Sequence, residues 1–410
     1  MLRRKQRGIT LVIVTIALFS LIVVGGLALD IGHVMVNKAR LQATVDAAAL
    51  SAAKVLDVTG STTQATTTAT NILGLNAQNH SDLLAVYGGV TKKVEYSNTL
   101  IPFNPGTTPP LYVRVTASGF SIAATLASVA GFSSFTIAAT AVAGPSPAIH
   151  TACNLAPIAM CGTSPAPASQ PIYGYSAGEI MVIKYAGGGG GGIGPGNYNL
   201  LDYSGSGGSG VRTALAGGYS GCATIGNTVQ TKAGVTGGPT SQGINTRFNE
   251  YDGPMSGTQS TYPPDVITAQ PSDTSRLSCT DNSCTAVQTG SPAQTITNAS
   301  QYPTWSYEGM YSPRLASQSY DVAPPTGVPD RRVLAVPIAD CSGAGGGTTT
   351  LPVFGLACIF LLQDVTSGAT DVFAEVLSNC QVNGNPGPAP TTSPGPYKIQ
   401  LYHVDGSPES

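Results

Sequence analysis

Charged side chains are scarce in this chain of 410 residues. Asp, Glu, Lys and Arg make up 10% of it and leave a net charge of −2, whereas a soluble globular domain has roughly 25% charged residues. A nucleic-acid-binding protein needs a concentrated basic face, so nucleic acid is excluded as a partner. Low charge combined with many small polar residues is typical of a secreted, pilus-like or surface-layer product.

Residue types that support catalysis are few and scattered. The histidines occur in unrelated contexts, without a nucleophile elbow, a metal-binding pair or a carboxylate at helical spacing. They are His33, His80, His150 and His403. We therefore expect no catalytic residue, no cofactor and no metal, and we expect the chain not to be an enzyme.

Glycine, proline and hydrophobic residues are abundant instead. The 50 Gly and 30 Pro predict many loops and turns, and a hydrophobic content of 42% excludes a wholly disordered protein. A chain of this length is long enough for two or three domains, each with its own core.

The N-terminus carries the pattern of a membrane anchor. Residues 1–8 hold four cations, and the 21 residues from Ile9 to Leu29 carry no charge. As a helix this stretch is about 30 Å long, which is the hydrocarbon thickness of a bilayer. The cations before it and Asp30 after it predict a cytoplasmic N-terminus, with the rest of the chain outside.

Two kinds of processing compete with a retained anchor. A cleaved secretory signal has a shorter apolar region, roughly 7–15 residues, and a small-residue cleavage site, for which Gly26-Leu27-Ala28 is a poor match. A pilin-like leader would end at Gly8, but prepilins carry Glu where this chain has Ile13. The pattern favours a retained anchor and leaves processing open.

The cysteines agree with export. All of them lie in the distal part of the chain, and an even number outside the cytoplasm predicts up to four disulfides among 105 possible pairings. Cys279 and Cys284 are the easiest local pair, and zinc is the rival interpretation, although no histidine lies near them. The candidates are Cys153, Cys161, Cys222, Cys279, Cys284, Cys341, Cys358 and Cys380.

An alanine-rich amphipathic helix is predicted directly after the membrane span, from Asp30 to about Lys54. One face has apolar residues at steps of three and four, and the other is polar: the first holds Ile31, Val34, Leu41, Val45, Ala48 and Ala52, and the second His33, Asn37, Arg40, Thr44, Ser51 and Lys54. Alanine permits close backbone approach, so this helix is either a short core helix or a stalk packed on a neighbouring helix or the following domain. Asp46 faces either solvent or a partner.

This segment resembles the N-terminal signature of TadG-like proteins, of the TadE/TadG group of Flp pilus (tight adherence) assembly. A basic N-terminus and a membrane helix lead into Asp-x-Gly and then Leu-Gln-x-Ala-x-Asp-Ala-Ala-Ala-Leu, with Thr44 as a departure from the second alanine. The matching residues are Asp30, Gly32, Leu41, Gln42, Asp46, Ala47, Ala48, Ala49 and Leu50. The resemblance implies a single-pass component of the bacterial inner membrane with a periplasmic or extracellular body, whose partners are the lipid bilayer and other pilus-assembly or pilin-like proteins.

The remaining sequence predicts an α+β protein. Strands are expected from Lys92, at Leu111–Gly119 and at Ser133–Gly144, with a short helix at Phe120–Phe132, and the resemblance reaches to about Gly144. Farther on, RVLAVPIA (332–339) and LPVFGLACIFLL (351–362) predict a buried strand pair, because twelve residues are too few to span a membrane. We expect a TadG-like stalk helix and small α+β unit over 30–144, a linker over 145–157 and a β-rich, loop-heavy extracytoplasmic domain over 158–410.

Two motifs in the distal region imitate binding sites. Six consecutive glycines, Gly187 to Gly192, lack the Lys-Ser/Thr and the helix of a phosphate loop, so a plain loop is predicted. Asp202-Tyr203-Ser204-Gly205-Ser206 has the spacing of a von Willebrand factor A metal site, but the glycine-rich surroundings favour a turn.

These observations predict a membrane-anchored structural or assembly component of a Flp-type pilus or a related secretion system. The alternative is a surface-exposed adhesion or ligand-binding protein that uses the distal β-rich domain.

Overall fold

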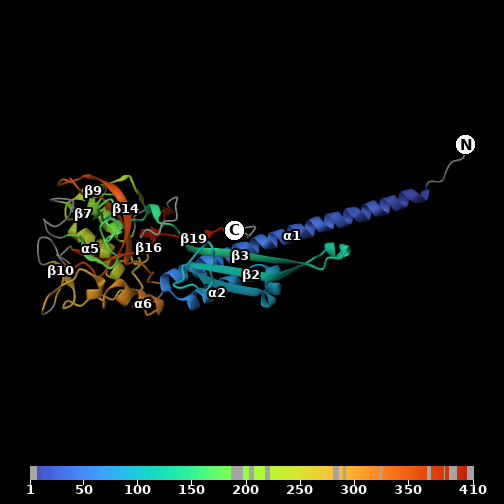
Figure 1. Ribbon diagram of the computed structural model, residues 1–410, viewed down its shortest axis with the longest axis horizontal. Helices are drawn as coiled ribbons and strands as arrows, with labels where there is room; N and C mark the ends of the chain where they lie inside the picture. Colours follow the sequence, from blue (N-terminus) through green and yellow to red (C-terminus); the bar gives the residue numbers. More distant parts are fainter. Residues whose placement is uncertain are drawn as a thin grey trace. The chain divides into compact units, whose positions relative to one another are not determined.

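The computed structural model describes residues 7–185, 197–202, 207–217, 222–279, 286–289, 292–322, 326–366, 371–382, 384–386 and 395–403. The chain forms two compact units (Figure 1). Unit 1 comprises Met1–Pro145 and Ile399–Ser410, and unit 2 comprises Ser146–Lys398.

Unit 1 begins with the helix α1 (Arg7–Thr59), which continues without interruption from the predicted membrane span. Gly60 ends it with a φ of +63°, a backbone conformation that glycine adopts without strain. Ser61 then caps α2 (Thr62–Gln78), because its side chain accepts a hydrogen bond from the Gln64 N–H. A shorter helix α3 (Ser81–Val86) and the 3₁₀ turn η1 (Tyr87–Gly89) lead to the sheet.

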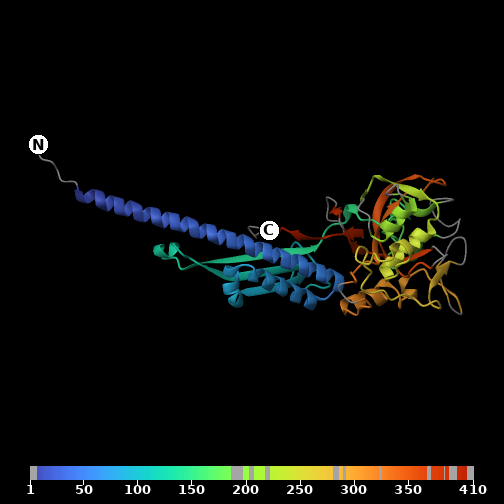
Figure 2. The same cartoon turned by 180° about the vertical axis from the view of Figure 1, so that it is seen from behind.

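The sheet of unit 1 has the strand order β1-β2-β3-β19, and all neighbouring strands are antiparallel. It lies alongside the C-terminal part of α1 (Figure 2). The strands are β1 (Thr91–Ser97), β2 (Tyr112–Ala123), β3 (Ser134–Pro145) and β19 (Ile399–Tyr402). Val113, Val115 and Ala117 alternate along β2 and are 0% exposed. They belong to one core with the alanine face of α1, so the predicted apolar face is covered from Leu41 to Ala52, whereas Ile31 is 43% exposed.

The helix predicted at Phe120–Phe132 is wrong. After a register shift between Ala117 and Phe120, alternation resumes: Phe120 and Ile122 are buried, whereas Ser121 and Ala123 are exposed. Pairing with β3 extends the strand to Ala123, and only the 3₁₀ turn η2 (Ala127–Ala130) remains helical. The period of two was therefore present, and cross-strand pairing outweighed the helix propensity of the alanines.

Strand β19 comes from the C-terminal segment, which the sequence assigned to the distal domain. Ile399 pairs with Pro145 and Tyr402 with Val142, and the Tyr402 hydroxyl donates to the Pro145 carbonyl. Nothing in the local pattern predicted this return to the first sheet.

Unit 2 is built on a sheet with the order β5-β13-β14-β15-β6, which β9 and β7 extend. Its strands are β5 (Met160–Cys161), β6 (Ile180–Lys184), β7 (Asn197–Leu201), β9 (Thr228–Ala233), β13 (Val333–Ala339), β14 (Thr350–Leu361) and β15 (Val372–Leu377). β13 and β14 pair antiparallel, which confirms the buried strand pair. Ile359, Phe360 and Leu361 are 0% exposed, so this apolar run is a core strand.

Smaller elements complete unit 2. The three-stranded sheets are β17-β4-β8 and β10-β11-β12, and β16 pairs with β18. Their bounds are β4 (Ile149–Cys153), β8 (Cys222–Thr224), β10 (Leu277–Cys279), β11 (Ala286–Gln288), β12 (Gln294–Thr295), β16 (Asn379–Gln381), β17 (Gly384–Pro386) and β18 (Gly395–Tyr397), and the helices are α4 (Gly207–Leu215), α5 (Gly237–Asn245) and α6 (Ser312–Ala316). Short turns follow at η3 (Thr246–Phe248), η4 (Gly253–Met255), η5 (Ala299–Gln301) and the π-helical η6 (Tyr307–Tyr311). Strand β4 lies inside the predicted linker, where pairing with β8 and β17 orders it.

Candidate anchoring helix and its contacts

The N-terminal part of α1 has an apolar surface that the rest of unit 1 leaves uncovered. Leu11, Leu18 and Leu21 are between 57% and 72% exposed. By length and composition this helix is able to cross a membrane. A soluble protein rarely exposes so large a continuous apolar patch, and a patch of this kind marks a contact with a membrane or with another protein.

The C-terminal part of α1 is buried within unit 1. Val45, Ala48, Ala49 and Ala52 are 0% exposed and pack with residues of α2, β2 and β3 in one core. Because alanine is small, the helix backbone approaches the sheet and α2 closely. Of the two interpretations, the stalk packed on a neighbouring helix and on the following domain is the one that the structure contains.

Asp30 connects α1 to the far end of the β2–β3 hairpin. Its Oδ2 accepts hydrogen bonds from the N–H groups of Thr125, at 3.0 Å, and Ala127, at 2.6 Å, and the residue is only 6% exposed. Hydrogen bonds to a charged carboxylate are among the stronger ones in proteins. This signature residue therefore fixes the hairpin end to the helix at the boundary of the predicted span.

Gln42 and Asp46 connect α1 to the middle of β3. The Gln42 amide nitrogen donates to Asp46 Oδ1, at 2.8 Å, and to the carbonyl of Thr140, at 3.0 Å. Gln42 is 8% exposed and Asp46 is half-buried. The contact of Asp46 lies within its own chain, where it orients the glutamine that holds the strand.

The polar face predicted on α1 is partly wrong. Asn37 is 0% exposed and Thr44 is 5% exposed, because the following helices pack over that side. The Asn37 amide donates to Asp82 Oδ2 of α3, and the His33 ring lies 2.9 Å from the same oxygen. The hydrogen bond from His33 lowers the pKa of Asp82 below its ordinary value.

The other signature residues differ in their surroundings. Leu41 is buried, and Ala47 and Leu50 are half-buried. Gly32 is exposed, and an added Cβ would meet nothing within 4 Å, so packing does not explain a glycine there.

Unit 2 contains the disulfides. Cys153 pairs with Cys222, Cys161 with Cys341 and Cys358 with Cys380. The suggested pair of Cys279 with Cys284 includes a residue outside the described part of the chain. The bond Cys161–Cys341 joins β5 to the segment after β13, across 180 residues of sequence.

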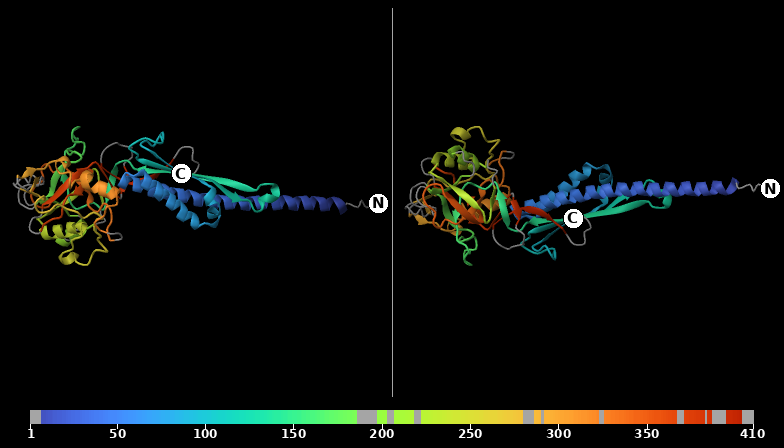
Figure 3. Two further views of the ribbon diagram at one scale, coloured as in Figure 1. Left: turned by 90° about the horizontal axis from the view of Figure 1, so that it is seen from below. Right: turned by 90° about the horizontal axis from the view of Figure 1, so that it is seen from above.

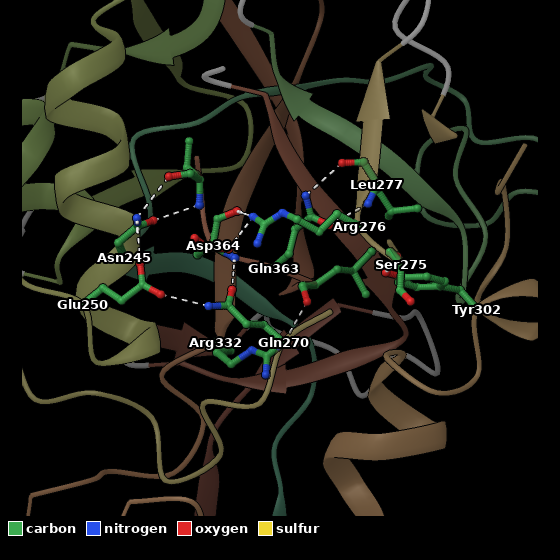
Figure 4. Close-up of polar contacts among 12 residues, drawn as sticks. Asn245, Glu250, Gln270, Ser275, Arg276, Leu277, Tyr302, Arg332, Gln363 and Asp364 are labelled. Carbon is green, nitrogen blue, oxygen red and sulfur yellow. Dashed lines mark hydrogen bonds and ion pairs between the residues drawn. The ribbon is translucent and has the colours of Figure 1, made fainter. Parts of the chain in front are cut away.

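A polar cluster ties the loops after α5 to the end of β14 (Figure 4). Glu250 accepts hydrogen bonds from the side chains of Asn245 and Gln270, at 3.2 and 2.9 Å. Asp364 accepts one from Arg276, and its N–H donates to Gln270, at 2.9 Å. Burial raises the pKa of Glu250, and the charge of Asp364 raises it further.

Two side-chain amides in this cluster each bond the backbone N–H and carbonyl of one residue, as a neighbouring strand would. Gln363 accepts from the N–H of Leu277 and donates to its carbonyl, at 2.8 and 3.0 Å. Asn245 does the same with Val365, at 2.8 and 3.0 Å. These contacts satisfy buried backbone groups. The cluster that contains Glu250 and Asp364 therefore has a structural role.

A second buried centre surrounds Arg332, which is 0% exposed. Its guanidinium donates to the carbonyls of Leu361, Leu362, Ile267 and Ala269 and stacks on Phe360. Asp265 accepts hydrogen bonds from the Tyr311 hydroxyl and the Arg332 N–H. Sequence reasoning missed this centre, since a lone arginine before a strand carries no special pattern.

The distal motifs that imitate binding sites provide no assembled centre in the described residues. Of Asp202-Tyr203-Ser204-Gly205-Ser206 only Asp202 is described, and the glycine run Gly187–Gly192 lies outside the described ranges. Among the residues that the structure describes, no group of three His, Cys, Asp or Glu side chains is placed to hold a metal. His33 bonds to Asp82.

A cavity of about 260 Å³ lies in unit 2, lined by Arg247, Arg331 and Asp330 among others. Arg247 donates to the carbonyls of Leu215 and Arg331, and Arg331 donates to those of Pro263 and Ala216. Ligand pockets usually hold about 300–1,000 Å³. The size and the occupied arginines do not favour a ligand site.

Comparison with known proteins places the N-terminal region. The family model described as putative Flp pilus-assembly TadE/G-like matches residues 8–55. This range covers nearly all of α1, including the signature residues from Asp30 to Leu50. Neither the search of curated proteins nor that of solved structures gave a match.

Proposed function

We propose that this protein is a single-pass, membrane-anchored structural component of a Flp-type pilus or a related secretion machinery. The observation that carries the proposal is α1 itself. One uninterrupted helix, Arg7–Thr59, has an exposed apolar half and a half buried in a folded core, and it is the segment that the pilus-assembly family model matches.

The proposed topology has the N-terminus in the cytoplasm of a bacterium and both units on the other side of the inner membrane. The cations at Arg3, Arg4, Lys5 and Arg7 support this orientation, because positive flanks remain cytoplasmic. The disulfides of unit 2 support it independently, because they persist in oxidising compartments.

The proposed role is mechanical and not catalytic. The helix that crosses the membrane is also the core helix of unit 1, so a load on unit 1 reaches the anchor along one continuous helix. The partners are the bilayer and other pilus-assembly or pilin-like proteins, which meet surfaces other than the alanine face, since unit 1 already covers that face.

Topology is tested first. In membranes from the source bacterium, an N-terminal tag should resist protease added to spheroplasts, whereas units 1 and 2 should be degraded. A variant with Arg3, Arg4, Lys5 and Arg7 replaced by Gln should lose this orientation, and the control Lys38→Gln/Arg40→Gln should keep it. A chain recovered from the soluble cytoplasm would contradict the anchor.

Assembly is tested by deletion. Removing the gene should abolish surface pili, and the full chain should restore them. Normal piliation and adhesion without the protein would contradict the assembly role and would favour the alternative, in which unit 2 acts as an adhesin.

A further inference from the structure

The end of the β2–β3 hairpin, residues 124–133, is an apolar projection of unit 1. Leu126, Val129 and Phe132 are 43%, 57% and 49% exposed, and Phe132 stacks on Phe135 with ring centroids 6.1 Å apart. We name residues 124–133 the hairpin tip. Exposed apolar clusters of this kind mark contact surfaces.

The hairpin tip is a folded turn. The Ala124 N–H donates to the Ser133 carbonyl, at 3.0 Å, and the Phe132 N–H donates to the Ala127 carbonyl, at 3.2 Å. Gly131 closes the turn with a φ of +93°. A turn that is held in this way presents its apolar side chains at fixed positions.

The hairpin tip lies against α1 inside the predicted membrane span. The hairpin runs along α1 toward its N-terminal end (Figure 3), and Asp30 binds its N–H groups. A Cβ added to Gly26 would lie 2.7 Å from Leu126 Cβ, whereas one added to Gly25 would meet nothing within 4 Å. Gly26 precedes Leu29 by three residues, which is about 4.5 Å along a helix.

The sequence around the tip contains no charge that would oppose contact with lipid. Residues 115–178 include no Asp, Glu, Lys or Arg. On α1 the nearest carboxylate is Asp30, and the tip itself covers it. The apolar surface of the tip therefore continues the exposed apolar surface of α1.

We propose that the hairpin tip inserts into the bilayer interface beside α1, as a second membrane contact of unit 1. Apolar residues of surface-bound segments reach about 5–10 Å into the boundary between headgroups and acyl chains, and Gly26, about 4.5 Å inside the predicted end of the span, lies close to the shallow limit of this range. Two contacts fix the rotation and tilt of α1 in a way that one helix does not. This inference rests on the proposed anchoring of α1.

The test uses the full chain in phosphatidylcholine vesicles, with and without lipids brominated on the acyl chains, which quench tryptophan by contact. The parent chain, whose one tryptophan is Trp305, supplies the background. Phe132→Trp reports on the tip and Phe19→Trp on the anchor. Ile101→Trp is the matched control, because Ile101 is 80% exposed but lies beyond the other end of β2, about 40 Å away along the strand.

We expect brominated lipid to reduce the added fluorescence at positions 132 and 19 and to leave that at position 101 unchanged. Quenching at 19 without quenching at 132 would overturn this inference and leave the anchoring intact. Absence of quenching at 19 would overturn both. Quenching at all three positions would also overturn it, since the contact would then be unspecific adsorption.

A second pair of variants tests the placement of the tip. In the Phe132→Trp chain, Gly26→Val forces Leu126 away from α1, so quenching at position 132 should fall, whereas Gly25→Val should leave it unchanged. Circular dichroism confirms that both variants fold. Equal quenching in the two variants would overturn the placement of the tip against Gly26.

Discussion

The cores of the two units are stabilised by different kinds of contact. Unit 1 contains no cysteine, and its core is apolar, with many alanines, from one long helix, α2 and a sheet. Unit 2 contains the disulfides and buries charged side chains, namely Lys184, Arg247, Asp265, Arg332, Asp364 and Glu375. In the described part of unit 1 the buried charged side chain is Asp30.

The difference follows from local structure. In unit 1, long regular elements satisfy their own backbone groups, so apolar packing is enough. Unit 2 has long irregular segments, whose backbone groups need side chains such as Arg332 and Gln363 as partners. Disulfides and side-chain hydrogen bonds therefore stabilise the irregular segments of unit 2, whereas regular helix and sheet hydrogen bonds stabilise unit 1.

The largest expected effect that separates the units comes from the disulfide Cys161–Cys341, which spans 180 residues. Replacing both cysteines by Ser should destabilise unit 2 by about 5 kcal/mol, from the chain entropy of a loop of that length. Hydrogen exchange should show lost protection in β13–β15 and unchanged protection in β2–β3. Equal loss in both units would show that they do not unfold independently.

Arg332 tests the buried polar links of unit 2. Arg332→Met leaves several buried carbonyls without a hydrogen-bond donor and removes the positive charge near the Asp265 carboxylate. We expect the free energy of unfolding to fall by about 3–5 kcal/mol. The control is Arg314→Met, because Arg314 pairs with Asp321 at the surface of the same unit, where a pair contributes about 0–1 kcal/mol. Urea unfolding monitored by Trp305 fluorescence measures both, and equal midpoints would contradict the role of Arg332.

Glu375 gives unit 2 a dependence on pH. Burial, together with the charge of Glu308, raises its pKa to about 7. Because the pKa is raised, the contribution of Glu375 to the free energy of unfolding is fully present below the unfolded pKa of 4.5. It falls by about 3 kcal/mol as the pH rises toward about 7. Glu375→Gln keeps an acceptor for the Tyr307 N–H and should remove this decline in urea midpoints measured from pH 4.5 to 8.

Glu95 of unit 1 is the opposite case and serves as the control. Burial works to raise its pKa, but hydrogen bonds from Lys93 and Arg114 lower it overall. Its contribution is present above the ordinary value and is lost as pH falls through the lowered one. A decline in Glu375→Gln as large as in the parent chain would show that another group is responsible, such as Glu250, whose pKa burial also raises.

The smallest effect concerns the alanine core of unit 1. Ala52 is 0% exposed, so Ala52→Val overpacks the contact of α1 with its neighbours and should cost about 1–3 kcal/mol. Ala43→Val shares the loss of helix propensity but lies on the exposed side of α1. Thermal melts of both variants should differ, and equal melting temperatures would show that the alanine face is loosely packed.

Sequence reasoning succeeded where one periodicity acts over many residues. The continuous helix and the pair β13–β14 were predicted because their patterns are long. It failed at Phe120–Phe132, where the alanines suggested a helix although Phe120 and Ile122 already alternated. It also missed the hairpin tip, for which the uncharged stretch 115–178 was the available signal, and it gave no indication that α3 buries Asn37 on the polar face of α1.

The amino-acid sequence by itself determined the membrane-length helix, its continuation through the alanine face and the β-rich character of the distal part. These features depend on residues that are neighbours in the chain. The tertiary structure alone decided that Asp30 holds the hairpin end, that Cys161 pairs with Cys341 and that Ile399–Tyr402 returns to the first sheet. Such pairings join residues up to hundreds of positions apart, and the free energy of the whole fold selects them among many locally equivalent alternatives.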